Sequence, residues 1–276
     1  MRKYNRYTIM FNLLYVIITM LFIFFICFGV FLTNGFIEKK PVRSILDTFK
    51  QRGEYVETVG IHSQKVNIYK VHTKYKYEKD NFKEVFNYKD GKEHYIGSKT
   101  DIILSNRNPL RNHGTALVAD AGLFFSSNFF IGHATININD DGSKYIESVG
   151  NDAGFYGVRE SDNTWIETEV RYGNDAQTIV GLRLKNVNEE KKNDIVEELK
   201  DKIGCEYNAN ILIKRKNKYY CTDLISRCLN KYNINIDYDR MYPTGNDFIV
   251  SENTFVIFIC ERIVEGEFNI YYLSEE

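Results

Sequence analysis

A long segment near the N-terminus, residues 9–32, carries no charged side chain and consists mainly of Ile, Leu, Phe and Val. A helix of this length rises about 36 Å, enough to cross a hydrocarbon core of about 30 Å. The segment is too long for the core of a signal peptide, and no small-residue cleavage site follows it. A buried core helix would show a polar stripe, which is absent. The sequence therefore predicts a single-pass membrane protein with a short tail (residues 1–7) and an uncleaved transmembrane helix (residues 8–33).

The flanking charges give little indication of the direction in which this helix would cross the membrane. Basic residues flank it on both sides: Arg2, Lys3 and Arg6 before it, and Lys39, Lys40 and Arg43 after it. The positive-inside bias is therefore weak, and long C-terminal domains cross a membrane largely regardless of charge. We expect the domain that follows to be extracytoplasmic.

Composition excludes several classes of function. Hydrophobic residues make up 43% and charged residues 26% of 276 residues, which is typical of a globular domain with additional segments. A net charge of -1 gives no basic face for nucleic acid. The chain has no P-loop, dinucleotide fingerprint or H-E-x-x-H motif, and its cysteines and histidines lack zinc-type spacing. We expect no cofactor, no metal and no nucleic-acid partner.

The five cysteines are not spaced as a disulfide framework. They are Cys27, Cys205, Cys221, Cys228 and Cys260, with no C-x-x-C pair. Cys27 lies in the membrane segment, and Cys228 and Cys260 lie in apolar patterns typical of buried thiols. Cys221 differs from the others in its position.

Cys221 lies where an amphipathic helix is predicted to begin. Leu224, Ile225, Cys228 and Leu229 follow it at offsets of three, four, seven and eight, so the sulfur shares the buried face. The unpaired N–H groups and the dipole at a helix N-terminus favour an anion, and hence a thiolate. The backbone N–H of Cys221 would also be a natural donor to an oxyanion.

A thiolate nucleophile needs a base, and His133 is the only histidine in strongly apolar, strand-like surroundings. Each residue alone has a simpler interpretation, since a Cys in an amphipathic helix usually belongs to the core and a lone strand His is usually structural. Together they suggest a cysteine hydrolase in which His133 is general base and then general acid.

The rest of the chain divides into two predicted regions. Residues 34–108 are expected to be a membrane-proximal linker and small β-rich extension without identifiable chemistry, with a helix at 41–50 and a hairpin within 85–96. Residues 109–276 form the expected domain. Its predicted strands are 115–119, 129–138, 144–149, 178–184, 254–263 and 268–273, and its helices are 188–203 and 221–232.

Six elements in chain order carry a resemblance to a known family. They are Gly132-His133-Ala134-Thr135-Ile136, Tyr145-Ile146-Glu147-Ser148-Val149-Gly150, Gly157-Val158 with Trp165, Gly204-Cys205-Glu206-Tyr207-Asn208, Tyr220-Cys221-Thr222-Asp223-Leu224 and Tyr242-Pro243-Thr244-Gly245-Asn246-Asp247. With these elements, residues 109–260 resemble the permuted, YiiX/YebB-like branch of the NlpC-type papain-fold cysteine hydrolases. The chain departs from that pattern at Gly114-Thr115, where the family has Gly-Asp, and at Thr222-Asp223, where it has Ser-Glu.

The resemblance implies an α+β domain of permuted papain type, with an antiparallel sheet packed against helices. It implies cleavage of an amide or related acyl bond, with cell-wall peptide as the first substrate class if the domain faces outward. Cys221 would be the nucleophile, His133 the proton shuttle and Glu147 the residue that orients the imidazole. Tyr207 matches a recurrent family tyrosine and would either donate a hydrogen bond near the thiolate or oxyanion, or pack as an ordinary aromatic residue.

The role of Glu147 depends on the connection between two strands. An ideal two-residue turn at Asp141-Gly142 would place Glu147 opposite Ile136, on the face away from His133. An odd-length loop or a bulge within 140–143 would restore the correct face. Ser148 is the alternative candidate.

Two other functions remain open. The same order of His before Cys occurs in lecithin:retinol-acyltransferase-like enzymes, which act on lipid acyl chains, and a membrane anchor brings lipid within reach. The chain could also be a catalytically silent, anchored binding module that retains the fold.

Overall fold

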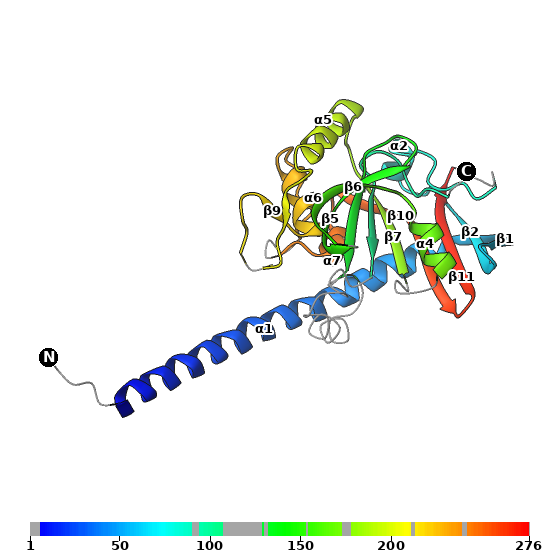
Figure 1. Ribbon diagram of the computed structural model, residues 1–276. Helices are drawn as coiled ribbons and strands as arrows, with labels where there is room; N and C mark the ends of the chain where they lie inside the picture. The colour runs from blue at the N-terminus through cyan, green and yellow to red at the C-terminus, as the bar shows by residue number, and fades with distance from the viewer. Residues whose placement is uncertain are drawn as a thin grey trace.

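The computed structural model of the chain describes residues 6–89, 94–106, 129, 132–152, 154–172, 178–210, 213–238 and 242–275. Over these residues the chain is a mixed α+β protein with one long N-terminal helix and a large, mainly antiparallel sheet. The predicted α+β class and the packing of an antiparallel sheet against helices are therefore confirmed (Figure 1). The predicted strand at 115–119 lies outside the described residues.

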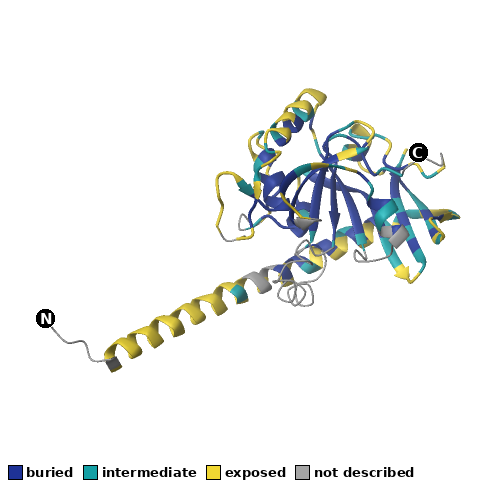
Figure 2. Ribbon diagram, viewed as in Figure 1, coloured by how far each residue is buried: buried dark blue, intermediate teal, exposed yellow. Residues whose placement is uncertain are grey.

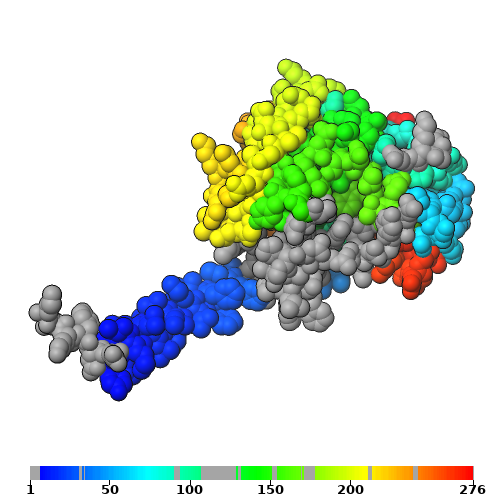
Figure 3. Space-filling view, in the orientation of Figure 1, coloured from blue at the N-terminus to red at the C-terminus, as the bar shows by residue number. Residues whose placement is uncertain are grey.

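The N-terminal helix α1 (Arg6–Gln51) is continuous over 46 residues. Residues 7–27 are all exposed, and Figure 2 shows this part extending away from the rest of the molecule. In the space-filling view of Figure 3, α1 leaves the globular body as a separate rod. By length and composition alone, this described helix is long and apolar enough to cross a membrane.

The second half of α1 belongs to the globular body. Val42, Leu46 and Phe49 are buried at helical spacing, and this part of α1 packs against α7 (Gly245–Val250) and β10 (Thr254–Val264). The helix predicted at 41–50 is thus the final part of α1, and Pro41 lies inside the helix. The apolar residues at 42, 46 and 49 explain why the chain stays helical after the exposed part of α1, because they cover one side of the domain.

Among the described residues, nine strands form one sheet in the order β1-β2-β11-β10-β7-β3-β4-β5-β6. The strands not yet given are β1 (Gly53–Ile61), β2 (Gln64–His72), β3 (Ile102–Ser105), β4 (His133–Asn137), β5 (Lys144–Asp152), β6 (Phe155–Asp162), β7 (Thr178–Leu184) and β11 (Glu267–Ser274). All neighbours are antiparallel except β2 and β11, which are parallel. Two short strands, β8 (Glu206–Tyr207) and β9 (Lys218–Tyr219), form a separate parallel pair.

The remaining described helices are short and lie around the sheet. They are α2 (Lys76–Asp80), α4 (Trp165–Tyr172), α5 (Glu189–Lys200) and α6 (Cys221–Asn230). Helix α6 packs on β4 and β5, and α5 packs on α6. In Figure 1 these two helices lie toward one end of the sheet, and β1 and β2 lie at the other end.

Residues 34–108, expected as a separate extension, contribute three strands to this sheet. β1 and β2 pair with each other and join the sheet through β11, while β3 lies between β7 and β4. All four residues of β3 are buried, so this short apolar run forms a central strand. Of the hairpin predicted within 85–96, the described residues show an isolated bridge between Phe86 and Ile96.

A buried ion pair joins the segment before β3 to β7. Arg183 donates through Nε to Asp101 Oδ1 at 2.9 Å and through Nη2 to Asp101 Oδ2 at 2.6 Å. Both side chains are buried, 4% and 1% exposed. The same guanidinium donates to the backbone carbonyls of Asn81 and Lys83, so it ties the 81–101 region to the sheet.

We predict that Arg183→Met destabilises the chain by about 3–5 kcal/mol, because it leaves the Asp101 carboxylate buried without its cation. The measurement is the free energy of unfolding in urea for the detergent-solubilised chain. Lys144→Ala is the matched control, since Lys144 forms a half-exposed pair with Glu160 at 2.8 Å. That change is expected to cost at most about 1 kcal/mol, and equal losses in both variants would contradict the assignment.

Candidate active site

Cys221 is the first residue of α6. Tyr220 before it has the extended backbone of an N-cap, φ −92° and ψ 170°. The Cys221 side chain is buried, and its Sγ lies 3.7 Å from the carbonyl oxygen of Gly132. Gly132 immediately precedes β4, so the start of α6 meets the start of the strand that carries His133. The N–H groups of a first helical turn have no acceptor within the helix, so donors converge beside the sulfur.

Backbone contacts on both sides hold Cys221 in place. The carbonyl of Tyr219 accepts hydrogen bonds from Ser148 Oγ at 2.7 Å and from Asn208 N at 3.0 Å. After the cysteine, Thr222 Oγ1 donates to the carbonyl of Pro243 at 2.6 Å. Ser148, the alternative candidate for orienting the imidazole, thus positions the segment before α6.

His133 begins β4 and is buried. Its Nε2 lies 2.7 Å from Glu147 Oε2, and its ring centroid lies 6.0 Å from that of Trp165 in α4. Within the described part of the chain, its buried Nδ1 has no hydrogen-bond partner of ordinary geometry. Since Nε2 is occupied by Glu147, Nδ1 is the nitrogen left to exchange a proton with Cys221.

The strand register places Glu147 on the face of His133. Glu147 pairs with Thr135 and Tyr145 with Asn137, and Ile138 N donates to the carbonyl of Lys144 at 2.9 Å. This register leaves residues 139–143 as a loop of five residues, the odd length required for the correct face. Gly142 permits the loop: its φ is +71°, and a Cβ there would lie 2.2 Å from the carbonyl oxygen of Gly97.

Two residues on β6 complete the surroundings of Glu147. Arg159 Nε donates to Glu147 Oε1 at 2.9 Å, and Ser161 Oγ donates to the same oxygen at 2.8 Å. Arg159 is directly opposite Glu147 in the β5–β6 register, and Ser161 is two residues further along. The sequence analysis missed both because it predicted no strand here. The turn-like Asn151-Asp152-Ala153-Gly154 and the facing charges of Glu147 and Arg159 were the available signals.

The charges in this cluster reinforce one another. Burial acts to raise the pKa of Glu147, but the His133 hydrogen bond and charge, then Ser161 and Arg159, outweigh it and lower the value from 4.5 to about 2. Burial acts to lower the pKa of His133, but its interactions with Cys221 and Glu147 raise the value from 6.5 to about 10. At neutral pH the imidazolium and the carboxylate are therefore both favoured.

These pKa shifts define the pH range in which the pair stabilises the fold. The contribution of ionised Glu147 is complete above pH 4.5 and is lost as the pH falls toward 2. The contribution of protonated His133 is complete below pH 6.5 and is lost as the pH rises toward 10. Both contributions are complete only in the mildly acidic range between 4.5 and 6.5.

Tyr207 lies close to the cysteine. It is buried in β8, and its ring packs edge-on against Tyr156 of β6 with centroids 5.4 Å apart. Burial, followed by the charge of Cys221 and by Tyr156, raises the pKa of Tyr207. Its hydroxyl therefore stays protonated and remains able to donate a hydrogen bond.

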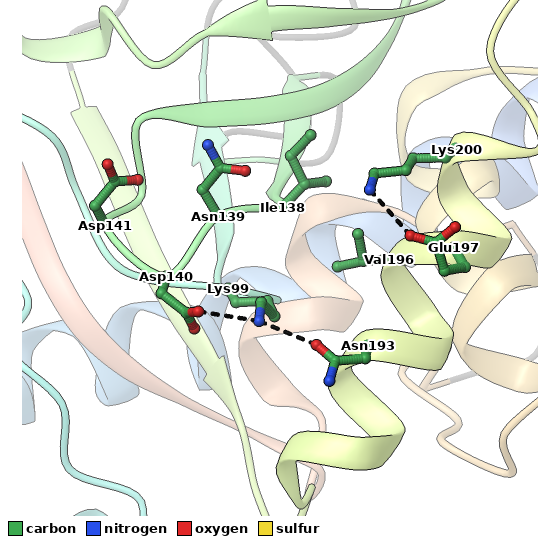
Figure 4. Close-up of a pocket in the computed structure, with 9 residues that line it drawn as sticks. All are labelled: Lys99, Ile138, Asn139, Asp140, Asp141, Asn193, Val196, Glu197 and Lys200. Carbon is green, nitrogen blue, oxygen red and sulfur yellow. Dashed lines mark hydrogen bonds and ion pairs between the residues drawn. The ribbon is translucent and has the colours of Figure 1, made fainter.

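The structure also has a cavity of about 570 Å³ away from this cluster, between the β4–β5 loop and α5. Residues 138–141 line it, and they follow the end of β4 opposite to His133. Figure 4 shows its lining residues. Lys99 donates to Asp140 at 3.1 Å and to Asn193 at 3.0 Å, and Lys200 donates to Glu197 at 3.0 Å. The cations drawn there already have partners, and neither Cys221 nor His133 lines the cavity.

The structure thus brings together Cys221, His133, Glu147 and Tyr207, which the sequence had separated by up to 88 positions. The chain matches no protein-family model, and no curated protein sequence is significantly similar to it. The chemistry of the cluster must therefore be argued from its own geometry.

We predict that Glu147→Gln lowers the pKa of His133 by about one unit or more, because a neutral amide no longer stabilises the imidazolium. The measurement is the NMR titration of labelled histidine, with the His133 signal assigned through a His133→Ala variant. Glu160→Gln is the control, since Glu160 lies on β6 but pairs with Lys144. An unchanged His133 titration in Glu147→Gln would show that the carboxylate does not act on the ring.

Proposed function

We propose that this chain is a membrane-anchored cysteine hydrolase that cleaves an amide or related acyl bond. The observation that carries the proposal is the 2.7 Å contact of His133 with Glu147, together with the Cys221 interaction that raises the His133 pKa. A thiol is activated when a base lies next to it and a carboxylate on the far side of the base orients that base. Burial of all three side chains strengthens their mutual electrostatic interaction.

In the proposed reaction, the Cys221 thiolate attacks the acyl carbon and forms a tetrahedral intermediate. The first N–H groups of α6 stabilise its oxyanion, and the Tyr207 hydroxyl is a second candidate donor. The His133 imidazolium gives its proton to the leaving nitrogen as the carbon–nitrogen bond breaks, leaving a thioester on Cys221. Neutral His133 then takes a proton from water, the hydroxide attacks the thioester, and the sulfur leaves as thiolate.

The finer features of the proposal rest on the resemblance. We assign residues 109–276, together with the strands β1, β2 and β3 that join their sheet, to the permuted papain-like type, in which the histidine strand precedes the cysteine helix. The membrane helix is α1, and we propose that the domain faces outward, with cell-wall peptide as the substrate class. The alternative of a lipid acyl substrate is supported by one feature, because α1 would hold the site near a bilayer.

The first test is the reactivity of Cys221 toward iodoacetamide. We predict that at about pH 5.5 Cys221 is alkylated at least about tenfold faster than Cys205, because the proposed mechanism pairs the Cys221 sulfur with the His133 imidazolium. Cys205 is an internal control, since it is more exposed than Cys221 and would react faster if access alone decided the rate. Mass spectrometry of the digested chain measures both rates in one sample.

The His133→Ala variant completes this test. It is expected to remove the advantage of Cys221 at acidic pH while leaving the Cys205 rate unchanged. If Cys221 reacts no faster than Cys205, and His133→Ala leaves its rate alone, the chain is a binding module and the proposed function is wrong.

The second test separates the two substrate classes. We predict that the detergent-solubilised chain releases new amino groups from peptidoglycan fragments and releases no fatty acid from phospholipid vesicles. Cys221→Ser should abolish the release, because a hydroxyl at this position lacks the acidity of a thiol. Fatty-acid or lysolipid release that depends on Cys221 would assign the chain to the lipid-acyl class.

A further inference from the structure

Glu147 is shared between two cationic groups. Its Oε2 contacts His133 Nε2 at 2.7 Å, whereas its Oε1 accepts from Arg159 Nε at 2.9 Å and from Ser161 Oγ at 2.8 Å. Glu147 is buried, so the carboxylate has little water with which to exchange these partners. Each oxygen is therefore committed to one side of the cluster, and His133 receives only part of the carboxylate's charge.

We propose that Arg159 is a positioning residue that acts through Glu147 to limit how tightly His133 holds its proton. This inference rests on the proposed function, because it assigns a role in the same proton transfer. Ser161 assists by fixing the carboxylate plane, and it does so without adding charge. Arg159 contacts Glu147 and the ring of Phe155.

Turnover requires His133 both to hold a proton and to release it. The imidazolium must form a stable pair with the thiolate and must also release its proton to a leaving nitrogen. A buried carboxylate with no other cation beside it would hold the imidazolium strongly and make it a weak acid. Arg159 competes for the same carboxylate, so Glu147 still orients the ring but attracts its proton less.

The described groups that face His133 come from several elements. Cys221 on α6, Glu147 on β5 and Trp165 on α4 lie next to the ring, and Arg159 and Ser161 on β6 act on it through Glu147. Among these, Arg159 is the one cation besides the imidazolium. Its side chain is 27% exposed, so its field is partly screened, and the effect is moderate in size.

A purely structural role for Arg159 makes a different prediction. Arg159 and Glu147 face each other across β5 and β6, so the pair could simply hold the two strands together. In that case its removal would lower stability and leave the protonation of His133 unchanged. A titration therefore distinguishes the two roles.

The experiment compares Arg159→Met, Arg159→Lys and Ser161→Ala in the full chain. The readouts are the NMR titration of His133 and the pH dependence of Cys221 alkylation. Arg159→Met is expected to raise the pKa of His133, and both limbs of the alkylation profile, by about half a unit or more. Arg159→Lys keeps the charge and Ser161→Ala keeps Arg159. In both variants the pKa of His133 should therefore differ from the parent value by no more than about half of the shift expected in Arg159→Met.

The outcomes are decisive in either direction. A folded Arg159→Met variant whose His133 titration is unchanged or moves to lower pH overturns the proposal. So does an Arg159→Lys variant that shifts as far as the methionine variant, because charge would then not be the cause. If Arg159→Met does not fold, the lysine variant is compared with Arg159→Gln under the same criteria.

The failure of the proposed function is seen elsewhere. It would be observed in the unmutated chain, as an alkylation rate of Cys221 no higher than that of Cys205. The NMR titration of His133 does not depend on turnover, so it tests the influence of Arg159 on the ring in that case too.

Discussion

The hydrogen bond between His133 and Glu147 is the contact on which the candidate site depends, and it is a consequence of strand register. The two residues share a face of the sheet because the loop between β4 and β5 has five residues. A loop one residue shorter would turn every side chain of β5 to the opposite face. Gly142 fits this loop against the backbone of Gly97, and Asn163 Nδ2 donates to the Gly142 carbonyl at 2.7 Å. Residues far from the chemistry thus determine which side chain meets the imidazole.

The cysteine reaches this pair through a second set of constraints. Helix α6 packs on β4 and β5, and its first residue meets the backbone just before His133. The segment before α6 is held by Ser148 and the segment after Cys221 by Pro243. Pro243 leads into α7, whose Gly245 N donates to the carbonyl of Phe129 at 3.1 Å and which packs against α1. Helix α1 is therefore connected through packed elements to both halves of the site.

The sequence was sufficient for features set by local pattern. The apolar run at 9–32, the helices beginning at Asn188 and Cys221, and the strands at 178–184, 254–263 and 268–273 correspond to observed elements, because each carries its own periodicity and end signals. Features set by distant contacts were not predicted. β3 is short, and only its neighbours β7 and β4 make it a strand. The sequence identified Glu147 but did not determine whether it lies on the same face of the sheet as His133. Arg159 and Ser161 were not predicted because β6 was not recognised as a strand.

The parallel pairing of β2 with β11 has a consequence for how the chain is made. Lys65 and Glu267 are 202 positions apart, yet their strands are neighbours and their side chains form an ion pair. When α1 and the β1–β2 hairpin leave the ribosome, one edge of that hairpin still lacks its partner. Such non-local pairings form late and slowly. The β1–β2 hairpin is therefore made well before the sheet can close, and during synthesis the open edge of β2 is the surface that a chaperone would need to cover.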